Sequence, residues 1–149
     1  MAPAENNRIC TIPNEISNLV DLGLLGMEYG GLTVLIPSKL GHLDILYFLD
    51  LDFNQLTGSI PYELLTQATL EQIYLNKNRL SVNVEGIELL RGLVFIHIHN
   101  NSFTGTIPPE IGDITDLGKE DSVKVCDAQV LFYPSFAIFY KQNRRRAHI

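Results

Sequence analysis

The chain has 149 residues, of which 46% are hydrophobic and 19% charged, and its formal net charge is −6. This length and composition fit one ordinary globular domain. Four of the eleven basic residues lie in the last nine positions, so the rest of the chain is acidic and lacks the basic surface that nucleic-acid binding requires.

A pattern with a period of 24 residues runs from Asn6 to Leu117. Ile-Pro dipeptides recur at residues 12–13, 36–37, 60–61 and 107–108, and Val84-Glu85 takes the intervening place. An apolar frame precedes each later dipeptide: Leu22, Leu25, Met27 and Leu32; Leu46, Leu49, Leu51 and Leu56; Leu70, Ile73, Leu75 and Leu80; Leu93, Ile96, Ile98 and Phe103. A fixed period of this length indicates stacked supersecondary units, none of which can bury its apolar edge alone.

The amino-terminal residues begin in the middle of this pattern. Residues 6–13 read as the second half of a repeat whose first half is absent. This predicts a fragment, a truncated gene product or a degenerate capping repeat. Residues 1–8 contain no apolar run, so no signal peptide is predicted in this chain.

Each period predicts three local structures in order, and residues 46–61 show them most clearly. The Leu49-x-Leu51 alternation has period two and predicts a short strand. Asn54, with counterparts at Asn78 and Asn101, follows where the chain must turn inward. A buried amide at this place can bond free backbone groups of the bend and of the neighbouring repeat. The few residues after Pro61 predict only one or two turns of helix or 3₁₀ structure.

These residues resemble the plant-type leucine-rich repeat, whose consensus is L-x-x-L-x-L-x-x-N-x-L-[ST]-G-x-I-P. The clearest matches are residues 46–61 and 93–108. The resemblance implies a leucine-rich repeat solenoid of the α/β superhelix class, with a curved parallel β-sheet on the concave face and short helical or 3₁₀ turns on the convex face. Receptor ectodomains and secreted inhibitors of plants share this repeat, which implies an extracellular or membrane-associated place.

Two repeats depart from the consensus. The first has Gly30 in place of the asparagine and Val34 in place of the glycine; the third has Val82 for the glycine and Val84-Glu85 for Ile-Pro. We expect both repeats to be locally irregular, and the first to lack one amide of the asparagine series.

The frame stops after Leu117, so the predicted domains are a solenoid over 1–117, with the half repeat and about four repeats, and an irregular cap or tail over 118–149. The apolar run 128–140 is shorter than the ~20 residues that span a bilayer. It predicts a cap over the open end of the stack, with Phe132, Phe136 and Phe139 buried. An interfacial membrane anchor and frame-shifted sequence are the alternatives. Cys10 and Cys126 fall at opposite ends and should be free thiols.

Function in such a solenoid is expected from the side chains that point outward from the concave strands. Eleven form the candidate ligand-binding face: Glu28, Tyr29, Phe48, Asp50, Asp52, Gln72, Tyr74, Asn76, Phe95, His97 and His99. Aromatic rings beside carboxylates and amides suit a protein, peptide or carbohydrate ligand. The alternatives are a solvated sheet that binds nothing specific and a structural remnant of a longer receptor.

Catalysis, a metal and a cofactor are not predicted. His97-x-His99 could supply two zinc ligands, but a third from Asp50 or Asp52 would lie two strands away, ~9–10 Å distant at the backbone. An open sheet also lacks the pocket that acid–base catalysis needs. Asn100-Asn101-Ser102 is the only N-x-[ST] sequon, and a structural position at the strand end accounts for its asparagines without glycosylation.

Overall fold

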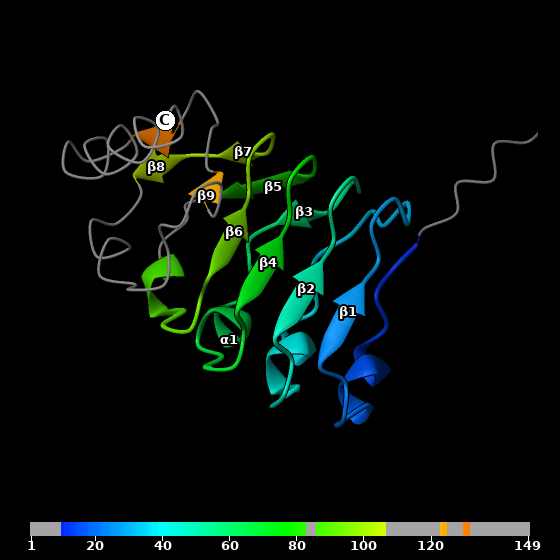
Figure 1. The fold of residues 1–149 in the computed structure, drawn as a ribbon. Coiled ribbons are helices and arrows are strands. Elements are labelled where there is room, and N and C mark those ends of the chain that lie inside the picture. Colours follow the sequence, from blue (N-terminus) through cyan, green and yellow to red (C-terminus); the bar gives the residue numbers. More distant parts are fainter. Residues whose placement is uncertain (1–9, 83–85, 107–122, 125–129, 132–149) are drawn as a thin grey trace, which may run out of the picture.

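The computed structural model describes residues 10–82, 86–106, 123–124 and 130–131. Within these ranges the chain forms a stack of similar turns, each with a strand on one side and, in most turns, a short helical element on the other (Figure 1). The predicted solenoid is therefore confirmed. Among the described residues, no helix has the length and apolar character needed to cross a bilayer.

One parallel sheet forms the concave face. Its strands lie in the order β1 (Leu24–Gly26), β2 (Phe48–Asp50), β4 (Gln72–Tyr74), β6 (Phe95–His97) and β9 (Val123–Lys124). Equivalent residues of successive repeats pair directly: Leu25 with Leu49, Leu49 with Ile73, and Ile73 with Ile96. The sequence repeat thus sets the register of the sheet, so residues at one position of the repeat form a column across the strands.

A second set of strands follows the asparagine turn. It contains β3 (Thr57–Gly58), β5 (Arg79–Val82) and β7 (Ser102–Phe103), and a separate pair of β8 (Gly105–Thr106) with β10 (Val130–Leu131). The first repeat contributes only two isolated bridges, Cys10 with Leu32 and Leu35 with Thr57. This agrees with the irregularity expected there.

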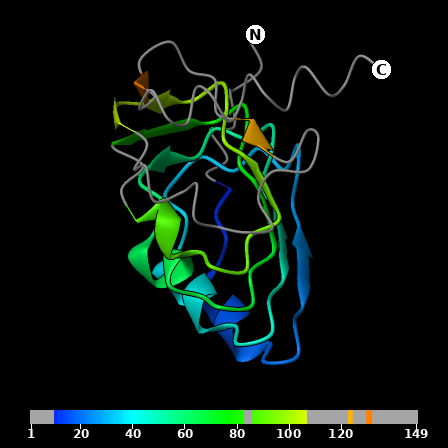
Figure 2. The same ribbon diagram turned by 60° about the vertical axis from the view of Figure 1, so that its left-hand side comes forward.

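Short helical turns cover the side opposite the concave sheet (Figure 2). They are η1 (Asn14–Asn18), η2 (Ser38–His42), α1 (Tyr62–Leu65) and η3 (Ile87–Leu89). Pro13, Pro37 and Pro61 precede the first three in extended conformation, whereas the third full repeat, which lacks Ile-Pro, uses Gly86 at φ 88°. Neighbouring turns pack closely: a Cβ on Gly41 would lie 2.4 Å from the carbonyl carbon of Glu63.

The apolar frame forms one continuous core. In the second and third full repeats all eight frame residues are fully buried: Leu46, Leu49, Leu51, Leu56, Leu70, Ile73, Leu75 and Leu80. Ile12 is also buried, at 4% exposed, and Cys10 is half-buried with a free thiol. Cys10 lies beside Leu32 of the first full repeat, and the half repeat predicted over residues 6–13 stays a prediction, because residues 6–9 lie outside the described ranges. Cys126 lies outside the described residues.

The asparagines form the predicted series of bonds between repeats. The Oδ1 atoms of Asn54, Asn78 and Asn101 accept the backbone N–H of the residues that follow the turn of the preceding repeat: Leu32 at 2.9 Å, Leu56 at 2.9 Å and Leu80 at 3.0 Å. Each Nδ2 donates to a carbonyl of its own repeat and to one of the preceding repeat, as Asn78 does to Leu75 and Leu51. These amides satisfy backbone groups that the bend would otherwise leave unpaired.

The concave sheet continues beyond the predicted end of the repeats at residue 117. Val123 pairs with Ile96 and Lys124 with His97, which places β9 beside β6 as a further strand. The signal was present in Val123-Lys124-Val125, an apolar alternation that the polar residues 118–122 obscured. The expected burial of Phe132, Phe136 and Phe139 falls outside the described residues and stays a prediction.

Candidate ligand-binding face

The concave sheet presents two rows of side chains that the register aligns. Phe48, Gln72 and Phe95 form one row, and Asp50, Tyr74 and His97 form the next. All six are partly exposed, while the alternate residues Leu49, Ile73 and Ile96 are fully buried. Strand alternation therefore separates a core face from a solvent face, as the sequence predicted.

Aromatic rings connect these rows across three strands. The Phe48 and Tyr74 ring centroids lie 5.5 Å apart, and the Tyr74 ring meets the His97 ring edge-on at 4.8 Å. The Tyr74 hydroxyl donates to Gln72 Oε1 at 3.3 Å. Such contacts favour a fixed orientation of the rings. The result is a continuous patch of ring edges and polar groups, here called the aromatic patch: Phe48, Asp50, Gln72, Tyr74, Phe95 and His97.

Two residues predicted to face solvent do not. Asp52 is 8% exposed and Asn76 6% exposed, because each side chain lies against its neighbour along the column. Asp52 Oδ1 accepts the backbone N–H of Asn76 at 2.6 Å, and Asp52 Oδ2 accepts its amide N–H. The exposure expected for these two residues is wrong. They form a polar link between the second and third full repeats, and little of either side chain can meet a ligand.

Two further carboxylates, those of Asp50 and Glu28, lie near Asp52. Burial raises the pKa of Asp52 to about 6, and the charges of Asp50 and Glu28 add to the shift against the opposing hydrogen bonds from Asn76. Partial burial, followed by the charges of Asp50 and Asp52, also raises the pKa of Tyr74. The aromatic patch therefore lies beside a region of negative potential, which favours a cationic group on a bound ligand.

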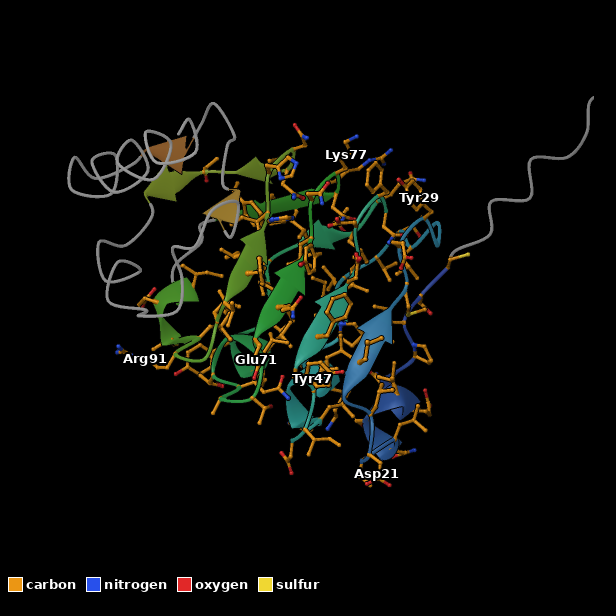
Figure 3. The ribbon with its side chains drawn as sticks, in the orientation of Figure 1. Asp21, Tyr29, Tyr47, Glu71, Lys77 and Arg91 are labelled. Atoms are coloured by element: carbon orange, nitrogen blue, oxygen red, sulfur yellow. The ribbon has the colours of Figure 1, made fainter. Side chains whose placement is uncertain are left out.

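A second feature, which we call the rim column, lies just past the carboxyl ends of the strands. Tyr29, Phe53, Lys77 and Asn100 all have left-handed backbone, with φ of 52° to 56°. The Tyr29 and Phe53 rings stack at 4.3 Å, and Lys77 Nζ lies 4.3 Å from the Phe53 ring centroid. Figure 3 shows Tyr29 and Lys77 together at this end of the sheet, opposite Tyr47 and Glu71.

Sequence reasoning placed Tyr29 on the ligand face but did not predict the stack. The signal was the recurrence of Tyr29, Phe53 and Lys77 at intervals of 24 residues immediately before the asparagine position. Non-glycine residues rarely adopt left-handed backbone, so this conformation could not be read from their identity. Phe53 contacts both the Tyr29 ring and the Lys77 ammonium group and is partly exposed, whereas Tyr29 is 69% exposed.

The remaining predicted residues lie around the patch. Glu28 is exposed beside Gly26, and His99 is partly exposed with its ring centroid 6.2 Å from that of His97. In the described ranges, no three His, Cys, Asp or Glu side chains come together in a group that could hold a metal ion. The face offers aromatic contact, carboxylates and imidazoles for noncovalent binding.

Comparisons with known proteins find leucine-rich repeats in this chain and similar sequences in plant receptors. The Leucine Rich Repeat family profile matches residues 46–66 and 92–114. Receptor-like protein 31 of Arabidopsis thaliana is 37% identical over 84 residues, which are 55% of this chain and 10% of that protein. The leucine-rich repeat receptor protein kinase MSP1 of Oryza sativa subsp. japonica is 36% identical over 92 residues, 58% of this chain and 7% of that protein.

Solved structures share the fold. The plant peptide hormone receptor RGFR1, in complex with RGF2, superposes with a TM-score of 0.70 and 35% identity, over 73% of this chain and 18% of that chain. The chain thus spans a tenth or less of the length of the two receptor relatives and under a fifth of this receptor structure.

Proposed function

Because this chain is a leucine-rich repeat protein of the plant type, we propose that it recognises a peptide through its concave face, without catalysis. The observation that carries the proposal is the aromatic patch: three strands place ring edges and polar groups in one continuous, partly exposed surface. Receptor structures with this fold bind peptide hormones, including RGFR1 with RGF2, which supports a peptide as the ligand class.

The charges beside the patch define the kind of peptide. Asp50 and Glu28 lie near Asp52 and raise its pKa, so their carboxylates share one region of the face. A basic side chain bound there would relieve this repulsion. Apolar or aromatic side chains of the same peptide would contact Phe48, Tyr74 and Phe95, since aromatic residues in such positions often dominate binding energy.

The main alternative is a structural remnant whose face binds nothing. A displayed library of random peptides, selected on the immobilised full chain, separates the two. The proposal expects enrichment of peptides that combine basic and aromatic residues. If the library yields no peptide above background on correctly folded protein, the proposal fails and the remnant reading stands.

Alanine variants then locate the site. Tyr74→Ala or Phe95→Ala should weaken a selected peptide by ~1–3 kcal/mol, measured by calorimetry on variants with native circular dichroism. Tyr62, which is 66% exposed on the convex side, provides the matched control; Tyr62→Ala should leave affinity unchanged. Loss of binding in Tyr62→Ala with none in the two concave variants would place the site on the convex side.

A further inference from the structure

The turn after β6 contains two adjacent asparagines with different surroundings. Asn101 is partly buried and belongs to the asparagine series: its Nδ2 donates to the carbonyls of Leu75 at 2.8 Å and Ile98 at 3.0 Å. Asn100 is exposed, and in the described part of the chain its side chain makes no hydrogen bond. The structural role that accounts for Asn101 therefore does not account for Asn100.

Backbone conformation does not account for Asn100 either. It has φ of 55°, and asparagine tolerates this left-handed region better than most residues. Tyr29, Phe53 and Lys77 nevertheless hold the same conformation at the same position of their repeats. The fold thus accepts bulky side chains here, and each of them projects from the end of the sheet rather than into the core.

We propose that Asn100 is a site of N-linked glycosylation. Asn100-Asn101-Ser102 is the only N-x-[ST] triplet in the chain, and both Asn100 and Ser102 are exposed. In the transfer, the Asn100 amide nitrogen forms a bond to the first sugar carbon of a lipid-linked oligosaccharyl pyrophosphate. The carbon–oxygen bond to the pyrophosphate breaks, the amide loses one proton, and the lipid pyrophosphate leaves.

The position leaves the core and the proposed peptide site accessible. The Asn100 carbonyl accepts the backbone N–H of Asn78 at 3.3 Å, so only the backbone of Asn100 is engaged in the stack. A glycan on Asn100 would extend from the rim column beside Lys77, on the side of the sheet away from Phe48. It would border the ligand face at its carboxyl-terminal end. The inference requires passage through the secretory pathway, which the similarity to plant receptor-like proteins supports.

The test uses the full chain behind a cleavable secretion signal, translated with microsomes, and follows only the protease-protected product. The wild type should carry a mass increase that peptide N-glycosidase removes. Asn100→Gln and Ser102→Ala should abolish it, and Ser102→Thr should retain it. Asn101→Gln is the matched control, because it displaces the amide of the asparagine series by one methylene and preserves the sequon, so its product should still be glycosylated.

Thermal unfolding of the purified wild type, before and after glycosidase treatment, completes the test. The midpoint should change little, because the Asn100 side chain contacts nothing that the fold needs. A protected wild-type product without a glycosidase-sensitive mass overturns the proposal. So does a glycosylated product that fails to fold while the Ser102→Ala product folds, because the site would then be incompatible with the native structure.

Discussion

The first full repeat and the two that follow have the same sequence frame but not the same burial. Leu49, Leu51 and Leu75 are fully buried, whereas Leu25 and Met27 are only partly buried. Cys10 pairs with Leu32, which is 2% exposed, but no described residue pairs with β1 on its outer side. Burial in this solenoid therefore depends on the neighbouring repeat as much as on the residue itself.

Polar contacts show the same difference. Asn54 and Asn78 each connect two repeats through buried amide bonds, and the first repeat has Gly30 at the equivalent position. Asp52 joins the second full repeat to the third through Asn76, whereas the equivalent Glu28 is exposed. The central repeats are thus coupled in three ways, by core packing, by amides and by this carboxylate.

Truncation of the core should reveal the largest difference. Leu51→Ala or Leu75→Ala should lower the free energy of unfolding by ~2–5 kcal/mol, since either leaves a cavity between two repeats. Leu25→Ala should lower it by about half as much, because part of that side chain is already solvated. Denaturant titration measures all three. Equal losses at the three positions would show that the first repeat is as well supported as the others.

Loss of one buried amide should have the next largest effect. Asn78→Ala removes the acceptor of the Leu56 N–H and the donor to the Leu51 and Leu75 carbonyls. We expect a loss of roughly 2–4 kcal/mol, because buried groups remain unpaired. Asn18→Ala, at an exposed asparagine of η1, is the matched control and should change stability by less than about 0.5 kcal/mol. Similar losses of stability in the two variants would show that Asn78 stabilises the fold no more than an exposed asparagine does.

Burial of the Asp52 carboxyl group should make stability depend on pH. The pKa of Asp52 is raised from 3.8 to about 6 in the folded chain, so the folded state holds this proton more tightly than the unfolded state. The stabilisation that comes from proton binding by Asp52 is fully present below the unfolded pKa of this group, and it is lost as pH rises through about 6. The stability of the wild type relative to Asp52→Asn should therefore fall by roughly 1–2 kcal/mol between about pH 4 and pH 7. A constant difference across this range would contradict the assignment. Asp44→Asn serves as the control, because Asp44 is exposed and is not among the charges that raise the pKa of Asp52.

The rim column should give the smallest effect. Lys77→Gln removes the charge over the Phe53 ring and should cost ~0.5–1 kcal/mol, as exposed cation–π contacts do. A double-mutant cycle with Phe53→Leu measures the coupling. Additive effects of the two changes would mean that the observed contact does not stabilise the fold. Since the contacts among Tyr29, Phe53 and Lys77 extend from the first repeat to the third, the coupling also reports how firmly the outer repeat is held.

The repeat frame made most of the fold predictable. Each leucine of the frame has one position relative to its neighbours, so the strand register, the core and the roles of Asn54, Asn78 and Asn101 followed from spacing alone. The outward row was also placed correctly for Phe48, Tyr74 and His97. Prediction failed where side-chain contacts, and not the strand alternation, determine exposure. Asp52 and Asn76 are at outward positions, yet they bury each other through hydrogen bonds that no periodicity encodes.

Other features were missed for related reasons. The stack of Tyr29, Phe53 and Lys77 depends on a left-handed backbone that these residue types do not signal. The strand at Val123 follows a polar segment, and its frame is displaced from the period, since it pairs 27 positions after Ile96. Spacing therefore predicts regular contacts between repeats and misses those that depend on an irregular backbone or a local insertion.

Native-state hydrogen exchange tests the central claim most directly. The backbone N–H groups of Met27, Leu51 and Leu75 each donate to the next repeat at 2.8 Å, to the carbonyls of Asp50, Tyr74 and His97. Because the three bonds have equal length, different protection must come from the support of neighbouring repeats. The account predicts that Met27 exchanges at least about tenfold faster than Leu51 and Leu75, a difference of ~1.4 kcal/mol in opening free energy. Equal protection at all three amides would contradict it.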